Sequence, residues 1–425
     1  MNALWLHLRF SVARWTVAPL AVLGMAVLFG RNRYWIGIWP EAGAAAQVSA
    51  FFVALFAAGT AAWIAATVTV RGLQEQAATA AIRPSIIELT RFAATLIWLL
   101  VPYLAVAVTA AVCTAASVSA PGTGAFLRYT MLGILLIVLA AAWGWFVGHL
   151  LAPLVGSVCA MLSWFIGATL LGDVADATVV SGPPWLTVES GPLAIRLAAV
   201  LLFAAAVCAI PWRPGSWMRF GRGVAVSVVA LGAVVAAHMA TTALGPRRPA
   251  ANPLCVQGTI EYCLWPEHAK YVPLVRSADE RLAALPVRLA LPRRVVDYSM
   301  SGSTRWVDGM EIEVAGVHDA EFDISEGSRW ALARGLATAI ANTVFAGCSV
   351  DARPDPEHRW DRLRAWLESR LAGGGEPDYR TNAPYEFQDA WSAGRRMAAD
   401  PSQQRQAAWV SMLIAEVVAS HCHAA

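Results

Sequence analysis

The stretch Phe126–Leu150 reads FLRYTMLGILLIVLAAAWGWFVGHL, and its only charged or histidine side chains are Arg128 and His149. As an α-helix it would be about 37 Å long, which is enough to cross a hydrocarbon core of about 30 Å. We therefore predict a membrane span here. The same criterion, applied outward along the chain, predicts seven spans in all: Val12–Gly30, Val48–Val70, Phe92–Cys113, Phe126–Leu150, Leu154–Leu171, Ile195–Pro211 and Val224–Leu244.

The charges divide the chain near Leu244. The first 244 residues carry 12 Arg and 6 Asp or Glu, whereas the last 181 residues carry 20 Lys or Arg and 23 Asp or Glu. The charge density of the second part is near the 25% of a soluble domain, and that of the first part is far below it. Neither part is basic enough to indicate nucleic-acid binding. A cleaved signal peptide competes for the first span, but six further spans follow it.

The arginines predict the orientation in the bilayer. With the N-terminus in the cytoplasm, eight of the twelve arginines before Leu244 fall on inner segments, as the positive-inside rule requires. Arg247 and Arg248 lie beyond the last span and oppose this orientation. An odd number of spans then places the part after Leu244 outside the cell, and we expect a plasma-membrane protein.

The predicted inner loop between the second and third spans reads RGLQEQAATAAIRP over residues 71–84. Leu73–Ile82 is rich in Ala and Gln, which favours a short helix, and Pro84 should end it. A helix lying across the cytoplasmic face would suit docking to a cytosolic partner. A plain connector carrying positive-inside arginines is the alternative.

Arg71–Arg91 resembles the coupling loop of actinobacterial ABC-2-type transporter permeases, which often read Arg, Gly, a few residues, Glu, Leu-Leu-Ala-Ala and then Pro. In this chain the Leu-Leu-Ala-Ala core is replaced by Gln76-Ala77-Ala78-Thr79. The segment around Gly144–Leu151 is similar to the Gly-Tyr-x-x-Gly-Arg-x-x-Pro stretch of the same permeases, with Trp145 in place of Tyr and His149 in place of Arg. The resemblance covers roughly residues 1–220. Such permeases usually have six spans, so the seventh is an addition that carries the C-terminal domain outside.

The resemblance implies a permease subunit of an ABC-type exporter, working as a dimer with a separate ATPase subunit. The chain has no Gly-x-x-x-x-Gly-Lys-Ser/Thr loop to bind ATP itself, and we expect no enzymatic activity, cofactor or metal. The residues expected to couple to the ATPase are Arg71, Gly72, Leu73, Glu75, Gln76, Arg83, Pro84 and Glu88.

Beyond a linker at residues 245–254, we predict an extracytoplasmic α+β domain over residues 255–425. Partial alternation predicts its strands, and longer apolar periodicity predicts its helices. The predicted strands are Val287–Leu291, Val295–Met300 and Glu311–Ile324. The predicted helices are Pro266–Leu285, Glu326–Phe345 with Ser325 as N-cap, Pro356–Leu371, Ala383–Ala399, and Pro401–His421 with Asp400 as cap.

Four cysteines fall in this domain, and four cysteines allow three pairings. We favour Cys255–Cys263, which closes a short loop, and Cys348–Cys422, which ties the Glu326–Phe345 helix to the last helix. The segment Cys263–His268 is similar to a Cys-Val-x-Pro-type motif that follows the last span in some of these permeases. The resemblance implies a role in receiving substrate or binding a partner outside the cell.

Candidate enzymatic residues are few. The pairs Glu267-His268 and Glu357-His358 stand where helices are predicted to begin, and a Glu there suits the helix dipole. The chain lacks both His-Glu-x-x-His and Gly-x-Ser-x-Gly patterns. A membrane hydrolase is therefore the weakest hypothesis. A membrane-anchored receptor or scaffold, whose outer domain binds a ligand or protein, is the main alternative to the permease.

Overall fold

The fold is that of a computed structural model, which divides the chain into two compact units, Met1–Arg248 and Pro249–Ala425. We describe each unit by itself. The structure describes residues 3–30, 33–70, 84–175, 179, 181–210, 217–241, 244–245, 252–300, 304–307, 310–313, 320–346, 358–376 and 385–421.

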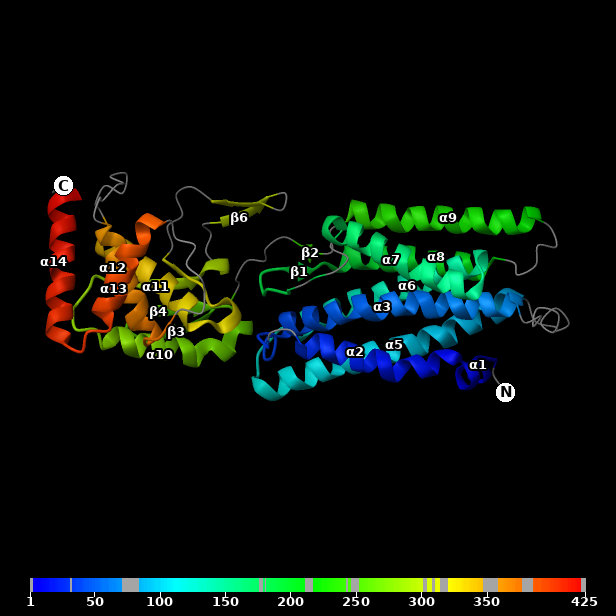
Figure 1. The fold of residues 1–425 in the computed structure, drawn as a ribbon, viewed down its shortest axis with the longest axis horizontal. Coiled ribbons are helices and arrows are strands. Elements are labelled where there is room, and N and C mark those ends of the chain that lie inside the picture. Colours follow the sequence, from blue (N-terminus) through cyan, green and yellow to red (C-terminus); the bar gives the residue numbers. More distant parts are fainter. Residues whose placement is uncertain are drawn as a thin grey trace. The chain divides into compact units, whose positions relative to one another are not determined.

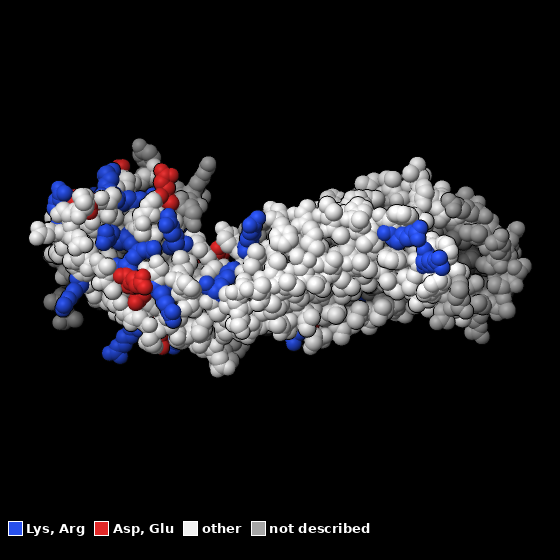
Figure 2. Space-filling model, turned by 90° about the horizontal axis from the view of Figure 1, so that it is seen from below, with Lys and Arg blue, Asp and Glu red and all other residues white. Residues whose placement is uncertain are grey.

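Within the described residues, the first unit has seven helices that are long and apolar enough to cross a membrane, as predicted. Its charged side chains are sparse on the face shown in Figure 2, whereas many charged side chains gather on the second unit. The spans are Val12–Gly30, Trp39–Thr67, Ser85–Ser117, Thr123–Leu150, Pro153–Leu170, Ser190–Cys208 and Phe220–Ala240. They belong to η1 (Val12–Thr16) with α2 (Val17–Gly30), α3 (Trp39–Val70), α5 (Pro84–Ser117), α6 (Thr123–Leu150), α7 (Pro153–Ala175), α8 (Ser190–Cys208) and α9 (Trp217–Ala240).

Helix α6 is the centre of this unit. Its span is 78% buried, against 22% for the spans of α7 and α9, and its most extensive packing is with α3 (Figure 1). Small residues make this close approach possible. A Cβ on Gly144 would overlap the carbonyl oxygen of Ala58, and a Cβ on Gly148 would overlap that of Ala62. Residues 144–148 thus form a Gly-x-x-x-Gly seam against the alanine face of α3.

The helix ends differ from the predicted spans. Helices α8 and α9 end at Cys208 and Ala240, before the predicted Pro211 and Leu244, whereas other helices begin earlier than predicted. Helix α3 begins at Trp39 rather than Val48, and α5 begins at Pro84 rather than Phe92. The hydropathy criterion finds only the part that matches the apolar core of a bilayer, while the backbone hydrogen bonds continue past it. The predicted helix Leu73–Ile82 lies outside the described residues.

Shorter elements complete the first unit. Helix α1 (Ala3–Phe10) is held on α5 because Trp98 Nε1 donates to the carbonyl oxygen of Leu8 at 2.9 Å. Strands β1 (Thr187–Val188) and β2 (Leu244–Gly245) pair antiparallel. The buried Arg196 of α8 donates to Thr241 Oγ1 at 3.1 Å and to the carbonyl oxygen of His238 at 3.3 Å, and so ties α8 to the end of α9.

The second unit combines helices with a four-stranded mixed sheet in the order β3-β4-β5-β8. The strands are β3 (Leu254–Gln257), β4 (Glu261–Leu264), β5 (Arg294–Asp297) and β8 (Glu321–Phe322), with a separate hairpin of β6 (Thr304–Val307) and β7 (Met310–Glu313). The helical elements are η2 (Pro266–Tyr271), α10 (Val272–Ala283), η3 (Tyr298–Met300), η4 (Ser325–Gly327), α11 (Arg329–Val344), α12 (Arg359–Ala372), α13 (Tyr385–Ala398) and α14 (Gln403–His421).

Several predictions for this unit are wrong. The last helix does not begin at Pro401 with Asp400 as cap: α14 begins at Gln403, and Ser402 Oγ accepts from the backbone N–H of Arg405. The predicted strand Val295–Met300 ends at Asp297, and Tyr298–Met300 forms the short helix η3.

Val287–Leu291 is not a strand. The stretch is only five residues long and is bounded by Pro286 and Pro292, and proline favours turns and loops. Ser325 is not the N-cap of α11. Ser328 takes that place, and its Oγ accepts from the backbone N–H groups of Trp330 and Ala331. The predicted linker also starts and ends in strands, at Gly245 in β2 and Leu254 in β3.

The hairpin β3–β4 carries the predicted disulfide. Cys255 and Cys263 are register partners and are bonded to each other. The adjoining turn is held by Asp279 of α10, whose carboxylate accepts from Thr259 N and from the hydroxyl of Tyr262, both at 2.9 Å. Burial and the Asp279 carboxylate raise the pKa of Tyr262. Cys348 and Cys422 lie outside the described residues.

Removal of this disulfide should destabilise the second unit. Closing a loop of this length constrains the unfolded chain by about 2.5 kcal/mol in the chain-entropy treatment. Under non-reducing conditions, mass spectrometry should find the two cysteine peptides joined, and Cys255→Ala with Cys263→Val should lower the melting temperature of this unit. A free thiol at either cysteine of the wild-type protein would show that the bond does not form.

Candidate functional site

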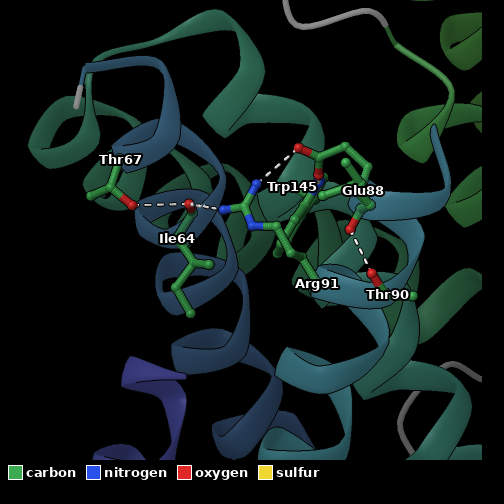
Figure 3. Close-up of polar contacts among 7 residues, drawn as sticks. Ile64, Thr67, Glu88, Thr90, Arg91 and Trp145 are labelled. Atoms are coloured by element: carbon green, nitrogen blue, oxygen red, sulfur yellow. Dashed lines mark hydrogen bonds and ion pairs between the residues drawn. The ribbon is translucent and has the colours of Figure 1, made fainter. Parts of the chain in front are cut away.

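A buried polar cluster joins three of the long apolar helices of the first unit. Glu88 and Arg91 stand one turn apart on α5, and their carboxylate and guanidinium form an ion pair with Arg91 Nη1 2.9 Å from Glu88 Oε1. Trp145 of α6 donates from its indole Nε1 to the second oxygen, Glu88 Oε2, at 3.0 Å. Figure 3 shows these side chains converging. We call these three residues the Glu88 cluster.

Arg91 connects the Glu88 cluster to α3 as well. Its Nη2 donates to the carbonyl oxygen of Ile64 at 3.1 Å, an oxygen that also accepts from Thr67 Oγ1 at 3.0 Å (Figure 3). The Arg91 guanidinium lies 5.6 Å from the centre of the Trp145 ring, within cation–π range. Phe92 packs edge-on against the same ring, with the ring centroids 5.3 Å apart.

The Glu88 cluster is enclosed. The side chain of Glu88 is 2% exposed and that of Arg91 is 12% exposed. Charges buried this deeply are stable only when they are paired and hydrogen-bonded, because desolvation costs several kcal/mol per ion. In membrane helices such charged residues are rare and mark functional positions by default. The pairing therefore identifies this cluster as the candidate functional site.

The Glu88 cluster involves both helices that flank residues 71–83, a segment that lies outside the described residues. Ile64 lies six residues before the last residue of α3, and Glu88 lies four residues after the first residue of α5. The contacts of Arg91 thus tie α5 to α3, and the bond from Trp145 ties α5 to the central helix α6.

The structure describes only some of the residues that were predicted to couple to an ATPase. Arg71, Gly72, Leu73, Glu75, Gln76 and Arg83 lie outside the described residues, and Pro84 is the first residue of α5. Glu88 is described, and its carboxylate faces Arg91 and Trp145 inside the unit rather than an open surface. The structure therefore gives Glu88 an internal contact and leaves its predicted contact with an ATPase as a prediction.

Two histidines lie near the cluster. His149 follows Trp145 by one turn of α6, and its Nε2 is buried without a hydrogen-bond partner in the described part of the chain. His7 belongs to α1, and burial together with the nearby Arg91 guanidinium lowers its pKa. The lowered pKa favours the neutral form of the His7 imidazole beside the ion pair.

A second polar network lies in the core of the second unit. His268 Nδ1 is 3.2 Å from Asp297 Oδ2, and Asp297 Oδ1 accepts from the hydroxyl of Ser299 at 2.6 Å. Trp265 Nε1 in turn donates to Ser299 Oγ at 2.7 Å. His268 lies in the first turn of η2, where a helix start was predicted, but it is buried and its imidazole contacts Asp297. The serine bonds to the aspartate and not to the histidine, so this is not the relay of a serine hydrolase.

Metal-type ligands gather at one place among the described residues, at Cys255, Glu261 and Cys263. The two cysteine sulfurs there are bonded to each other, so they are not thiolates that a metal would need.

Sequence reasoning used Glu88 and Arg91 separately and missed their pairing with Trp145. The available signal was two opposite charges three residues apart at the start of an apolar span, a spacing that places them on one helix face. The chain matches no family model, no curated protein and no solved structure.

Proposed function

We propose that this chain is the membrane-spanning permease subunit of an ABC-type exporter, acting as a homodimer and coupled to a separate ATPase subunit. The observation that carries the proposal is the Glu88 cluster, which links both helices flanking the loop at residues 71–83 to the central helix α6. The seven apolar helices and the sequence resemblance support the same class.

In the proposed mechanism the ATPase binds the loop at residues 71–83 on the cytoplasmic side. ATP binding and hydrolysis move the loop, and the bond from Arg91 to the Ile64 carbonyl oxygen carries the displacement between α5 and α3. The bond from Trp145 carries it to α6, whose tight packing on α3 makes the helices move as rigid bodies. Rocking of the spans then opens a path outward.

We place the second unit on the extracytoplasmic side. The arginine distribution supports this side, and the disulfide Cys255–Cys263 is of a kind that persists in oxidising compartments. There it would receive substrate or bind a partner.

Two kinds of variant distinguish binding of the ATPase from coupling of its motion to helix α6. Glu75→Ala with Arg83→Ala should lower the recovery of the ATPase with the purified chain by about tenfold, which corresponds to roughly 1.4 kcal/mol of lost contact energy. Trp145→Phe keeps most of the ring but removes the bond to Glu88. It should leave ATPase recovery unchanged and lower the ATPase turnover that export substrate stimulates.

The proposal fails if the loop variants leave both the recovery of the ATPase and its turnover unchanged.

A membrane-anchored receptor or scaffold is the second candidate, favoured by the compact second unit with its own core. That function predicts that deleting residues 250–425 abolishes all activity, whereas changing the loop at residues 71–83 has no effect.

A further inference from the structure

A cavity of about 400 Å³ opens in the second unit where three helices end. Arg281 comes from the end of α10, Arg370 from the end of α12 and Arg395 from the end of α13, and all three line the cavity. The remaining wall includes Ser369 and the turn Gly373–Gly375. None of the described residues that line the cavity is acidic.

Several polar groups of this wall have no partner. The Nε and Nη2 atoms of Arg395 are buried and make no hydrogen bond with the described residues. The same holds for Ser369 Oγ, whose residue is only 7% exposed. Arg395 has a cation–π contact with Trp391, at 5.4 Å from the ring centre, which orients the guanidinium without satisfying its N–H groups. Buried donors without an acceptor are costly to a fold, so these groups are available to hydrogen-bond an anionic ligand.

Contacts with the helix ends offset only part of the positive charge of the three arginines. Arg281 Nη1 donates to the carbonyl oxygen of Leu371 at 2.8 Å and so caps the end of α12. Each helix C-terminus carries a partial charge of roughly −0.5, so three of them offset about half of three guanidinium charges. The cavity therefore keeps a net positive potential.

The glycine turn leaves one side of the cavity without side chains. Gly373, Gly374 and Gly375 have φ values of 82°, 80° and 90°, a left-handed conformation that favours glycine. A Cβ at Gly374 would meet nothing within 4 Å, so space beside the backbone is open there. A ligand can approach the chain closely at this turn.

We propose that this cavity binds a phosphate group, carried by a small solute or by a lipid headgroup. Three guanidinium groups that reach the cavity from three helices suit a tetrahedral anion with a charge near −2, whereas one arginine fork already matches a planar carboxylate. The Ser369 hydroxyl supplies a further donor. This proposal is independent of the transport function.

The test uses the full-length protein in zwitterionic nanodiscs and inorganic phosphate as the probe. Phosphate is titrated against sodium chloride of equal ionic strength, and binding is followed by thermophoresis. We expect saturable binding that Arg370→Gln and Arg395→Gln each weaken by about tenfold. Arg396→Gln is the matched control, because Arg396 is the exposed neighbour of Arg395 on α13 and does not line the cavity.

A second arm identifies the source of the phosphate group. The same proteins are mixed with vesicles containing phosphatidylglycerol or phosphatidylcholine alone, and co-sedimentation is measured. Loss of binding in the cavity variants, but not in Arg396→Gln, supports the site in whichever arm it occurs, and the arm tells a solute from a headgroup. Absence of binding in both arms, or equal binding by all variants, overturns the proposal. If the cavity variants melted at a lower temperature but kept the phosphate affinity of the wild-type protein, the proposal would also be overturned. The arginines would then only stabilise the helix ends.

Discussion

Arg91→Met should destabilise the first unit by roughly 3–5 kcal/mol, because it leaves the buried carboxylate of Glu88 without its partner. The variant also loses the bond from Arg91 to the Ile64 carbonyl oxygen, so α5 is no longer tied to α3. We expect a large fall in the melting temperature of the detergent-solubilised protein and in the fraction that elutes as a single species in size-exclusion chromatography.

The double variant Glu88→Gln with Arg91→Met should recover much of this loss, since no unpaired charge then remains buried. Arg14→Met is the matched control, because Arg14 is an exposed arginine of the same unit with a single exposed hydrogen bond. If Arg91→Met were as stable as Arg14→Met, the Glu88 cluster would not hold the three helices together.

Gly144→Ala should have an effect of similar size through packing alone. The added methyl group would overlap the carbonyl oxygen of Ala58, and a backbone atom in a helix cannot move aside as a side chain can. Helices α3 and α6 must therefore separate, which costs more than the usual 1–3 kcal/mol of an overpacked core. We expect little folded protein in size-exclusion chromatography, and the same outcome for Gly148→Ala.

Gly167→Ala on α7 is the control for this experiment. It is also a helical glycine in an apolar span, but a Cβ there meets nothing within 4 Å. It should be neutral or slightly stabilising, because alanine has a higher helix propensity than glycine by up to about 1 kcal/mol. Equal behaviour of Gly144→Ala and Gly167→Ala would contradict the close seam between α3 and α6.

The sequence predicts the seven spans well because membrane hydropathy is a local property that each stretch of about 20 residues carries by itself. The helix ends are predicted less well. Trp39 begins α3 nine residues before the predicted span, since the helix continues outside the apolar region. In the second unit, the sequence predicts the disulfide Cys255–Cys263 but not the strands β3 and β4 that carry it.

The sequence predicts only part of the candidate site. Glu88 was singled out, but its contact with Trp145 joins residues 57 positions apart, and such a contact depends on how the helices pack. The arginine-lined cavity is even harder to predict from the sequence. Arg281, Arg370 and Arg395 are far apart in the chain and meet only through the tertiary fold. Local patterns carry no information on pairings of this kind.

The most direct test of the proposed function is photo-crosslinking from the loop at residues 71–83 in native membranes. A photoreactive amino acid replaces Gln76, and the full-length chain is purified in mild detergent after irradiation. The permease account predicts one dominant crosslinked partner, a P-loop ATPase whose recovery falls when Glu75 and Arg83 are substituted. Crosslinking that yields no ATPase, together with unchanged activity of the substituted loop, would contradict it.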